Sequence, residues 1–229
     1  MIVLDFSFLA EILGSVAFAV SGAVLGIKRE MDILGVFILA MVTTMGGGLL
    51  RDVILGNIPP VGLSNPIYIE IAILTSVLVI ILYKRSTLEM AEKVLYSMRF
   101  FDAIGLGIFT GIGLVTGLKF FPDKPFLGVT TAVLTACGGG VIRDVLAMRI
   151  PFILKEEVYA LASIIGAIIG YFIYGLVGAT ATLYISSIIT MAIRFICMKY
   201  NICLPNFKAK GTMKEEKEKL AEELQEKRA

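Results

Sequence analysis

The sequence predicts an all-α membrane protein with seven transmembrane helices: an inverted repeat of three plus three helices, followed by one C-terminal helix. Composition is the first reason, because 57% of the 229 residues are hydrophobic, only 17% are charged, and the mean hydropathy is +0.87. Soluble domains are much less apolar. The second reason is that apolar runs of the roughly 20 residues needed to cross a bilayer recur along the chain. The third is an internal repeat.

The apolar runs are joined by mostly short connections, which indicates one compact membrane domain over residues 1–204. We expect the first run to be retained, because no basic residue precedes it and it is too long for a signal peptide. From residue 205 the composition changes abruptly, so residues 205–229 are predicted to be a charged cytoplasmic tail. The seven runs cover about residues 6–27, 33–50, 66–83, 101–118, 126–142, 158–175 and 179–198.

One motif occurs twice, in register. Residues 45–59, MGGGLLRDVILGNIP, return as residues 137–151, CGGGVIRDVLAMRIP. The preceding spans also match, with glycine or phenylalanine at every fourth position of a stripe that favours close helix packing. We therefore expect one unit at about residues 5–83 and a second at about residues 97–175, with the seventh span outside the symmetry. Three spans per unit is an odd number, so the second unit must enter the membrane from the opposite side.

Loop charges predict the orientation. With the arginines of the two Arg-Asp motifs left aside, the second and fourth loops hold only Lys119 and Lys124, whereas the other three loops are rich in basic residues. The positive-inside rule then places the N-terminus outside and the C-terminus in the cytoplasm. Near the end of the seventh span, Arg194 is expected to face the cytoplasmic headgroups. Apart from Arg143 of the second Arg-Asp motif, the basic residues of the first, third and fifth loops are Lys28, Arg29, Lys84, Arg85, Lys93, Arg99, Arg149 and Lys155.

The glycine triplets are the strongest candidates for function. Each glycine costs about 1 kcal/mol of helix propensity relative to alanine, so we expect the second and fifth spans to be broken there. Irregular backbone at membrane depth is tolerated only where it is buried in protein or lines a water-filled path. There its carbonyl oxygens can coordinate a monovalent cation. Close packing of two helices is the alternative. The candidate pathway residues are Gly46, Gly47, Gly48, Gly138, Gly139 and Gly140, with the preceding hydroxyls of Thr43, Thr44 and Thr135.

Charged residues near membrane depth are the second set of candidates. Each triplet is followed by an Arg-Asp pair, Arg51-Asp52 and Arg143-Asp144. Ionisable groups there are costly and often functional, so the carboxylates could concentrate cations while the arginines hold the break or act as a gate. An ion pair that merely anchors the end of the span is the alternative.

Two further carboxylates, Glu11 and Asp102, occupy equivalent positions at the starts of the first and fourth spans. They suit a cation vestibule, although a charge one turn inside the interface can also snorkel to water without a role.

Several classes of function are excluded. Residues 1–198 hold 13 basic and 13 acidic residues, so no excess charge is available for nucleic acid. Histidine is absent, which removes imidazole catalysis and His-ligated metal sites. Neither a cofactor site nor a nucleophile–base constellation is indicated, so we do not expect an enzyme.

The duplicated GGG-x-x-RD unit in a seven-span chain resembles the prokaryotic trimeric intracellular cation (TRIC) channels, a family also described as bacterial glycine transporters. The resemblance covers nearly all of residues 1–200. It implies a homotrimer in the lipid of a prokaryotic plasma membrane, with one pore per protomer for potassium and other monovalent cations and with kinked second and fifth spans at the gate. It also leaves transport of glycine or another small amino acid open. A half-helix after each triplet would then bind the carboxylate with its N–H groups, helped by Arg51 or Arg143.

Overall fold

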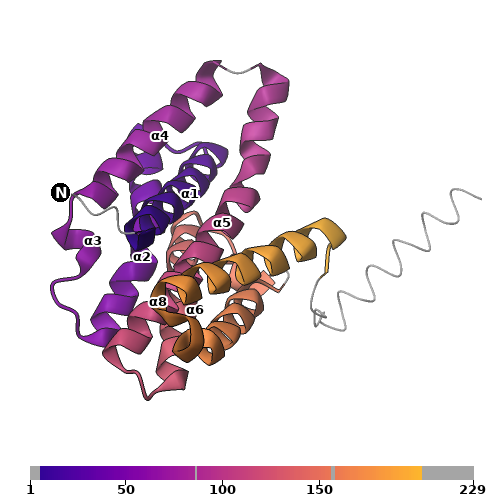
Figure 1. Ribbon diagram of the computed structural model, residues 1–229. Helices are drawn as coiled ribbons and strands as arrows, with labels where there is room; N and C mark the ends of the chain where they lie inside the picture. The colour runs from indigo at the N-terminus through magenta and orange to yellow at the C-terminus, as the bar shows by residue number, and fades with distance from the viewer. Residues whose placement is uncertain (1–5, 86, 156–157, 203–229) are drawn as a thin grey trace, which may run out of the picture.

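The computed structural model describes residues 6–85, 87–155 and 158–202. Its regular elements are all helices within these residues (Figure 1). The predicted tail at 205–229 lies outside the described residues. The helices are α1 (Phe6–Lys28), α2 (Ile33–Leu55), α3 (Val61–Ser64), α4 (Ile67–Arg85), α5 (Leu88–Phe120), α6 (Pro125–Leu146), α7 (Phe152–Lys155) and α8 (Tyr159–Tyr200).

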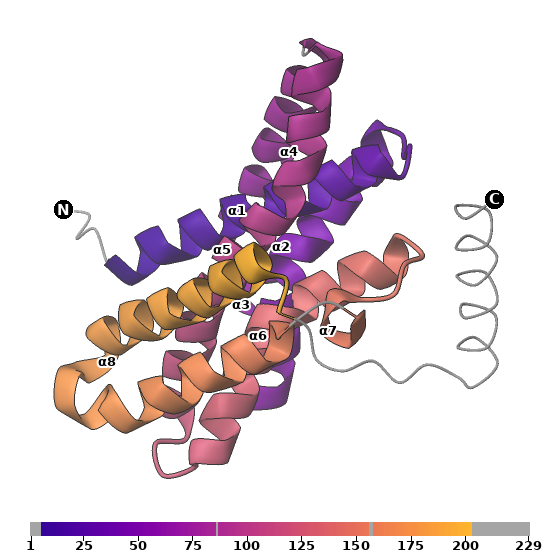
Figure 2. The same cartoon turned by 90° about the vertical axis from the view of Figure 1, so that its right-hand side faces the viewer.

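The prediction of seven membrane crossings is confirmed. Within the described residues, six helices are long and apolar enough to span a bilayer, and the last of them, α8, has 42 residues, about twice the length that one crossing needs. Gly178 lies within α8 at φ 78° and ψ 175°, a backbone conformation that interrupts the helix. The chain reverses there, and the two halves of α8 run back past each other as the sixth and seventh crossings (Figure 2).

The helices form two equivalent bundles of three. In the first, α1 packs against α2 and α4; in the second, α5 packs against α6 and α8. The two bundles meet where α1 packs against α5 and where α2 packs against α6. Even the short helices correspond, because α3 follows the first Ile-Pro pair as α7 follows the second.

The crossing of α1 and α5 confirms that the small-residue stripes pack helices together. Phe18 of α1 stacks on Phe109 of α5, with ring centroids 5.1 Å apart. A Cβ atom at Gly105 would overlap the Phe18 ring, and one at Gly14 would lie 3.1 Å from the Phe109 ring. Each phenylalanine therefore fills the space that the other helix leaves open, and the two repeats join through equivalent residues.

The expected breaks in the second and fifth spans are absent from this structure. Both α2 and α6 continue as single α-helices through their triplets. The propensity penalty of glycine was measured in water, where an opened helix can bond to solvent. At membrane depth an opened helix would leave backbone groups unpaired at several kcal/mol each, so an intact helix is favoured. The glycines have another role, which the crossing of α2 and α6 explains.

Candidate functional site

The middle of the site is the crossing of α2 and α6, which meet backbone to backbone at the two triplets. A Cβ atom at Gly47 would overlap the carbonyl oxygen of Thr135, and one at Gly139 would overlap the carbonyl oxygen of Thr43. The first glycines, Gly46 and Gly138, have equivalent surroundings, because a Cβ at each would lie 2.9 Å from an Ile or Leu methyl group of the other helix. Helices can approach this closely only where side chains are missing. The close-packing interpretation therefore holds for the first two glycines of each triplet.

The three candidate threonines divide into two kinds. Thr43 and Thr135 each donate a 2.5 Å hydrogen bond to the carbonyl one turn back in their own helix. Their hydroxyls face the small-residue stripes, since a Cβ at Gly22 would lie 2.7 Å from the Thr43 hydroxyl. Thr44 instead contributes to a cavity, described below. Of the three hydroxyls, only that of Thr44 is therefore placed to meet an ion or water in an internal space.

The Arg-Asp pairs hold the chain after each triplet in the same geometry. The Arg51 Nε donates to Asp52 Oδ1 at 2.8 Å, and the other Asp52 oxygen accepts the backbone N–H of Val61 at 2.9 Å. In the second repeat, Arg143 donates to Asp144 at 2.9 Å. The second oxygen of that aspartate accepts the first N–H of α7 at 3.0 Å. Both aspartates are fully buried, so each ties a long helix to the short helix that follows it.

The repeat-one cluster, defined as Glu11, Arg51, Asp52 and Tyr68, lies beside an internal space. The hydroxyl of Tyr68 on α4 donates to Glu11 on α1 at 2.6 Å. Both side chains are half-buried, and with Arg51 and Thr44 they line a cavity of about 40 Å³. A polar cavity of that volume holds about two to three water molecules. This end of the bundle can therefore be hydrated.

The equivalent of this cluster in the second repeat is the repeat-two cluster, defined as Asp102, Arg143, Asp144 and Tyr159. All four side chains are buried. Asp102 takes the place of Glu11, and Tyr159 takes the place of Tyr68. Arg143 forms an ion pair with Asp102 and also donates to the Ser21 hydroxyl at 2.5 Å. The guanidinium thus joins α6 to both α5 and α1, and its side chain is fully buried.

The third glycine of each triplet lies beside these clusters, and in the second repeat its missing side chain makes room for one of them. A Cβ at Gly140 would lie 3.1 Å from the Tyr159 hydroxyl and 3.6 Å from Arg143. At Gly48 the nearest atom is a nitrogen of Arg51 at 3.9 Å. The structure therefore brings together the Arg-Asp pairs, the two vestibule carboxylates and the last glycine of each triplet.

Two arginines that the sequence did not indicate as site residues contact the repeat-two cluster. Arg194 of α8 is 1% exposed, with its guanidinium carbon 4.9 Å from the centre of the Tyr159 ring. The expectation that it faces the headgroups is wrong, because the residue lies on the inner face of α8. Arg149 lies 3.5 Å from Asp144 and 3.9 Å above the Phe152 ring. Only the position of Arg149, matched with Asn57 by the repeat offset, could have indicated a difference between the two ends.

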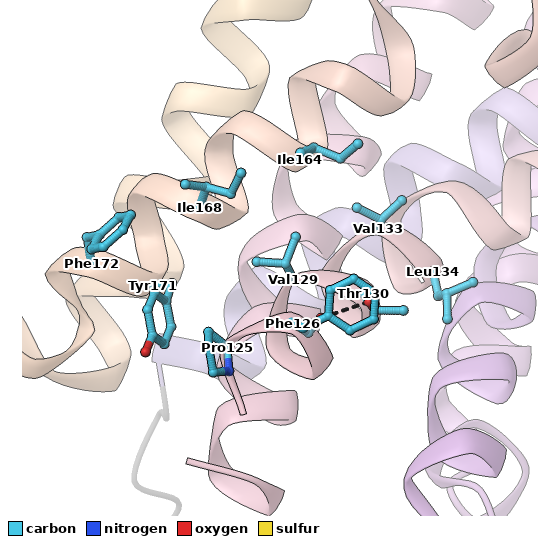
Figure 3. A pocket seen from close by; sticks show the side chains of 10 residues that line it. All are labelled: Pro125, Phe126, Val129, Thr130, Val133, Leu134, Ile164, Ile168, Tyr171 and Phe172. Atoms are coloured by element: carbon cyan, nitrogen blue, oxygen red, sulfur yellow. Dashed lines mark hydrogen bonds between the residues drawn. The ribbon is translucent and has the colours of Figure 1, made fainter. Parts of the chain in front are cut away.

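A separate groove lies on the outside of the bundle, between α6 and the first half of α8. Its volume is about 680 Å³, and no charged side chain lines it (Figure 3). The Thr130 hydroxyl is bonded to the carbonyl of Phe126 at 2.7 Å, which leaves little polarity for an ion. The groove is therefore not a cation site. Its lining residues are Pro125, Phe126, Val129, Thr130, Val133, Leu134, Ile164, Ile168, Tyr171 and Phe172.

Comparisons with known proteins agree with this architecture. A family model described as glycine transporter matches twice, at residues 8–84 and 99–175, once on each repeat. The membrane protein YvgT of Bacillus subtilis is 38% identical over 201 residues, which are 86% of this chain and 95% of YvgT. The inner membrane protein YadS of Escherichia coli is 36% identical over 200 residues, which are 86% of this chain and 94% of YadS.

Among solved structures, one described under conductance through TRIC cation channels superposes with a TM-score of 0.79. It is 34% identical, and the match covers 91% of this chain and 99% of that one. The chain therefore belongs to the family of the prokaryotic TRIC channels, which the matching model describes as glycine transporters.

Proposed function

We propose that this protein is a channel for monovalent cations, permeable to potassium, with one pore inside each protomer. The observation that carries the proposal is the pair of equivalent clusters at the ends of α2 and α6, each built from a carboxylate, a tyrosine and an arginine. Carboxylates in a water-accessible recess attract cations, and they are rare within membranes unless they serve such a path. The solved relative at 34% identity is described as a cation channel, which supports the same conclusion.

The pathway that we propose runs from the repeat-one cluster, past the crossing of α2 and α6, to the repeat-two cluster. The cavity beside Glu11 and Thr44 is its hydrated end. At the other end, the ion pair of Arg143 with Asp102 and the bond to Ser21 close the bundle. This end is the gate in our proposal, and the conformation described here is closed.

Repeat one shows the geometry that the gate would take when open. There the Glu11 carboxylate accepts a hydrogen bond from the Tyr68 hydroxyl, and the Arg51 guanidinium donates one to Asp52 beside a cavity. Opening of the second end would correspondingly break the ion pair of Arg143 with Asp102, while the hydrogen bond of Arg143 with Asp144 remains. Because Asp144 also anchors α7, the arginine can move without freeing the chain after α6.

The alternative, transport of glycine, has less physical support. It required a half-helix that begins after each triplet and presents unpaired N–H groups to a carboxylate. Because α2 and α6 are continuous, the N–H groups after the triplets are used within the helix. Both candidate arginines are already paired with aspartate.

We also propose that the channel is a homotrimer in a prokaryotic plasma membrane, with the N-terminus and the repeat-one cluster outside. The trimer follows from the solved relatives, one of which is described as a trimeric channel. The orientation follows from the basic loops, which lie on the side of the repeat-two cluster. Lipid acyl chains would occupy the outer groove between α6 and α8, since its lining is apolar.

Single-channel recording in planar bilayers under a potassium gradient tests the function. We expect discrete currents that reverse at the potassium potential and that do not change when millimolar glycine is added. Asp102→Asn should raise the open probability, because the neutral amide holds Arg143 less strongly than a carboxylate does. Silent bilayers combined with glycine uptake into proteoliposomes would overturn the proposal in favour of a transporter.

A further inference from the structure

The two ends of the bundle differ in charge although the repeats are otherwise equivalent. The repeat-one cluster contains two carboxylates, Glu11 and Asp52, and one arginine. The repeat-two cluster also contains two carboxylates and one arginine, but Arg149 and Arg194 contact it as well. The first end therefore carries one excess negative charge, and the second end carries one excess positive charge.

Neither additional arginine has a counterpart at the first end. Arg149 corresponds to the neutral Asn57 by the repeat offset, and both residues are half-buried. Arg194 comes from the seventh crossing, which lies outside the repeats and so has no equivalent at all. The asymmetry thus has two independent sources, one a divergence between the repeats and the other an added helix.

Arg194 is an unusual residue for a purely structural role. Its Nε and Nη1 atoms are buried, and neither has a hydrogen-bond partner among the described residues. A buried guanidinium with two unbonded nitrogens costs more than it returns in stability. Its contact with the face of the Tyr159 ring, at 4.9 Å, compensates for only part of that cost. The charge itself is therefore the property that the position supplies.

We infer that Arg194, together with Arg149, makes conduction asymmetric, so that cations enter more readily from the repeat-one end than from the repeat-two end. This inference rests on the proposed channel function. A unit charge about 10 Å from an ion changes its local concentration roughly two-fold even in water, and more in a partly desolvated site. The acidic end concentrates cations at its mouth while the basic end depletes them, so the current–voltage relation rectifies.

The test is the single-channel current of the full-length protein in symmetric 0.1 M KCl at equal positive and negative voltages. The wild type should rectify at least two-fold. Rectification should weaken in 1 M KCl, where the Debye length is about 3 Å instead of about 10 Å. The polarity is assigned from a cationic thiol reagent applied to one side of an Asn57→Cys variant.

Four variants separate charge from structure. Arg194→Lys keeps the charge and should keep the rectification, whereas Arg194→Gln should reduce it. Two double variants make the ends equal and should both give nearly ohmic currents. Arg149→Asn with Arg194→Gln leaves both ends acidic and should raise the conductance, whereas Glu11→Gln with Arg194→Gln leaves both ends neutral and should lower it.

The outcomes distinguish this inference from the proposed function. Opposite changes in conductance between the two double variants, with rectification lost in both, would support the electrostatic role. An ohmic wild type, or equal rectification in wild type and Arg194→Gln, would overturn the inference and leave the channel intact. Absence of any potassium current in the wild type would overturn the channel function, and the inference with it.

Discussion

A methyl group added at Gly47 should destabilise the protein by about 2 kcal/mol. The new Cβ would lie 2.9 Å from the carbonyl carbon of Thr135 and 3.3 Å from its Cα. These atoms belong to the backbone, so α2 and α6 must separate by roughly 1 Å before the carbons reach their favourable distance of about 3.5–4.0 Å. Overpacking of this kind costs about 1–3 kcal/mol, and a rigid backbone neighbour places it at the upper end. Alanine returns about 1 kcal/mol of helix propensity.

The neighbouring glycine provides a matched control. At Gly48 the nearest atom to a new Cβ is 3.9 Å away, at the end of the flexible Arg51 side chain. Gly48→Ala should therefore stabilise α2 slightly, by up to about 1 kcal/mol. Unfolding by SDS in mixed micelles, followed by far-UV circular dichroism, measures both variants. Equal stability of Gly47→Ala and Gly48→Ala would contradict the close backbone contact at Gly47.

The reciprocal position extends the test. A methyl group at Gly139 would press on the Thr43 carbonyl, at the same crossing but from the opposite helix. Once one methyl group has separated the helices, the second meets less resistance. The double variant Gly47→Ala/Gly139→Ala should therefore cost at least about 0.5 kcal/mol less than the sum of the single variants. Additive losses would show that the two contacts are independent.

Three further outcomes follow from the structure. Asp144→Ala leaves two buried donors, the Arg143 Nε–H and the first N–H of α7, without their acceptor, while Asp102 still pairs with Arg143. At about 1–3 kcal/mol for each donor, the variant should lose about 2–6 kcal/mol in the same unfolding assay, and a loss below about 1 kcal/mol would contradict the pairing. Gly178→Ala places a Cβ at φ 78° and ψ 175°, with no atom within 4 Å, so it should cost about 1–3 kcal/mol from the backbone alone, whereas Gly175→Ala should cost nothing. Cysteines at positions 57 and 149, in a Cys203→Ser background, should react with impermeant thiol reagents from opposite sides of the membrane, and labelling from one side would refute the inverted topology.

The sequence predicted the architecture because its signals are collective. Each apolar run is recognised from about 20 residues together, so no single residue decides it. The in-register repeat is visible directly in the sequence. Its prediction for the triplets failed because propensity describes one helix in isolation. The contact of Gly47 with the Thr135 carbonyl is a property of two helices 88 positions apart in the chain, and no local penalty reports it. Likewise, the sequence left both interpretations of the Arg-Asp pairs open, because the backbone N–H groups that the aspartates bind lie eight or nine residues further along.

Differences between equivalent positions carry more information about function than the shared motif does. The glycine crossing and the aspartate anchors, which both repeats keep, serve the fold that both repeats share. Glu11 and Asp102 differ by one methylene group, and only the shorter side chain forms an ion pair with the arginine of its repeat. The proposed gate is therefore the end at which the arginine on α6 forms an ion pair with the carboxylate on α5. In a Glu11→Asp variant the carboxylate side chain is one methylene shorter, so its hydrogen bond with the Tyr68 hydroxyl should weaken. The carboxylate would then attract Arg51 toward α1, and the cavity of about 40 Å³ should close. A fall in single-channel open probability, with unchanged thermal stability, would be the signature of a second gate formed at the repeat-one end; unchanged gating would show that the length of this carboxylate does not decide which end is closed.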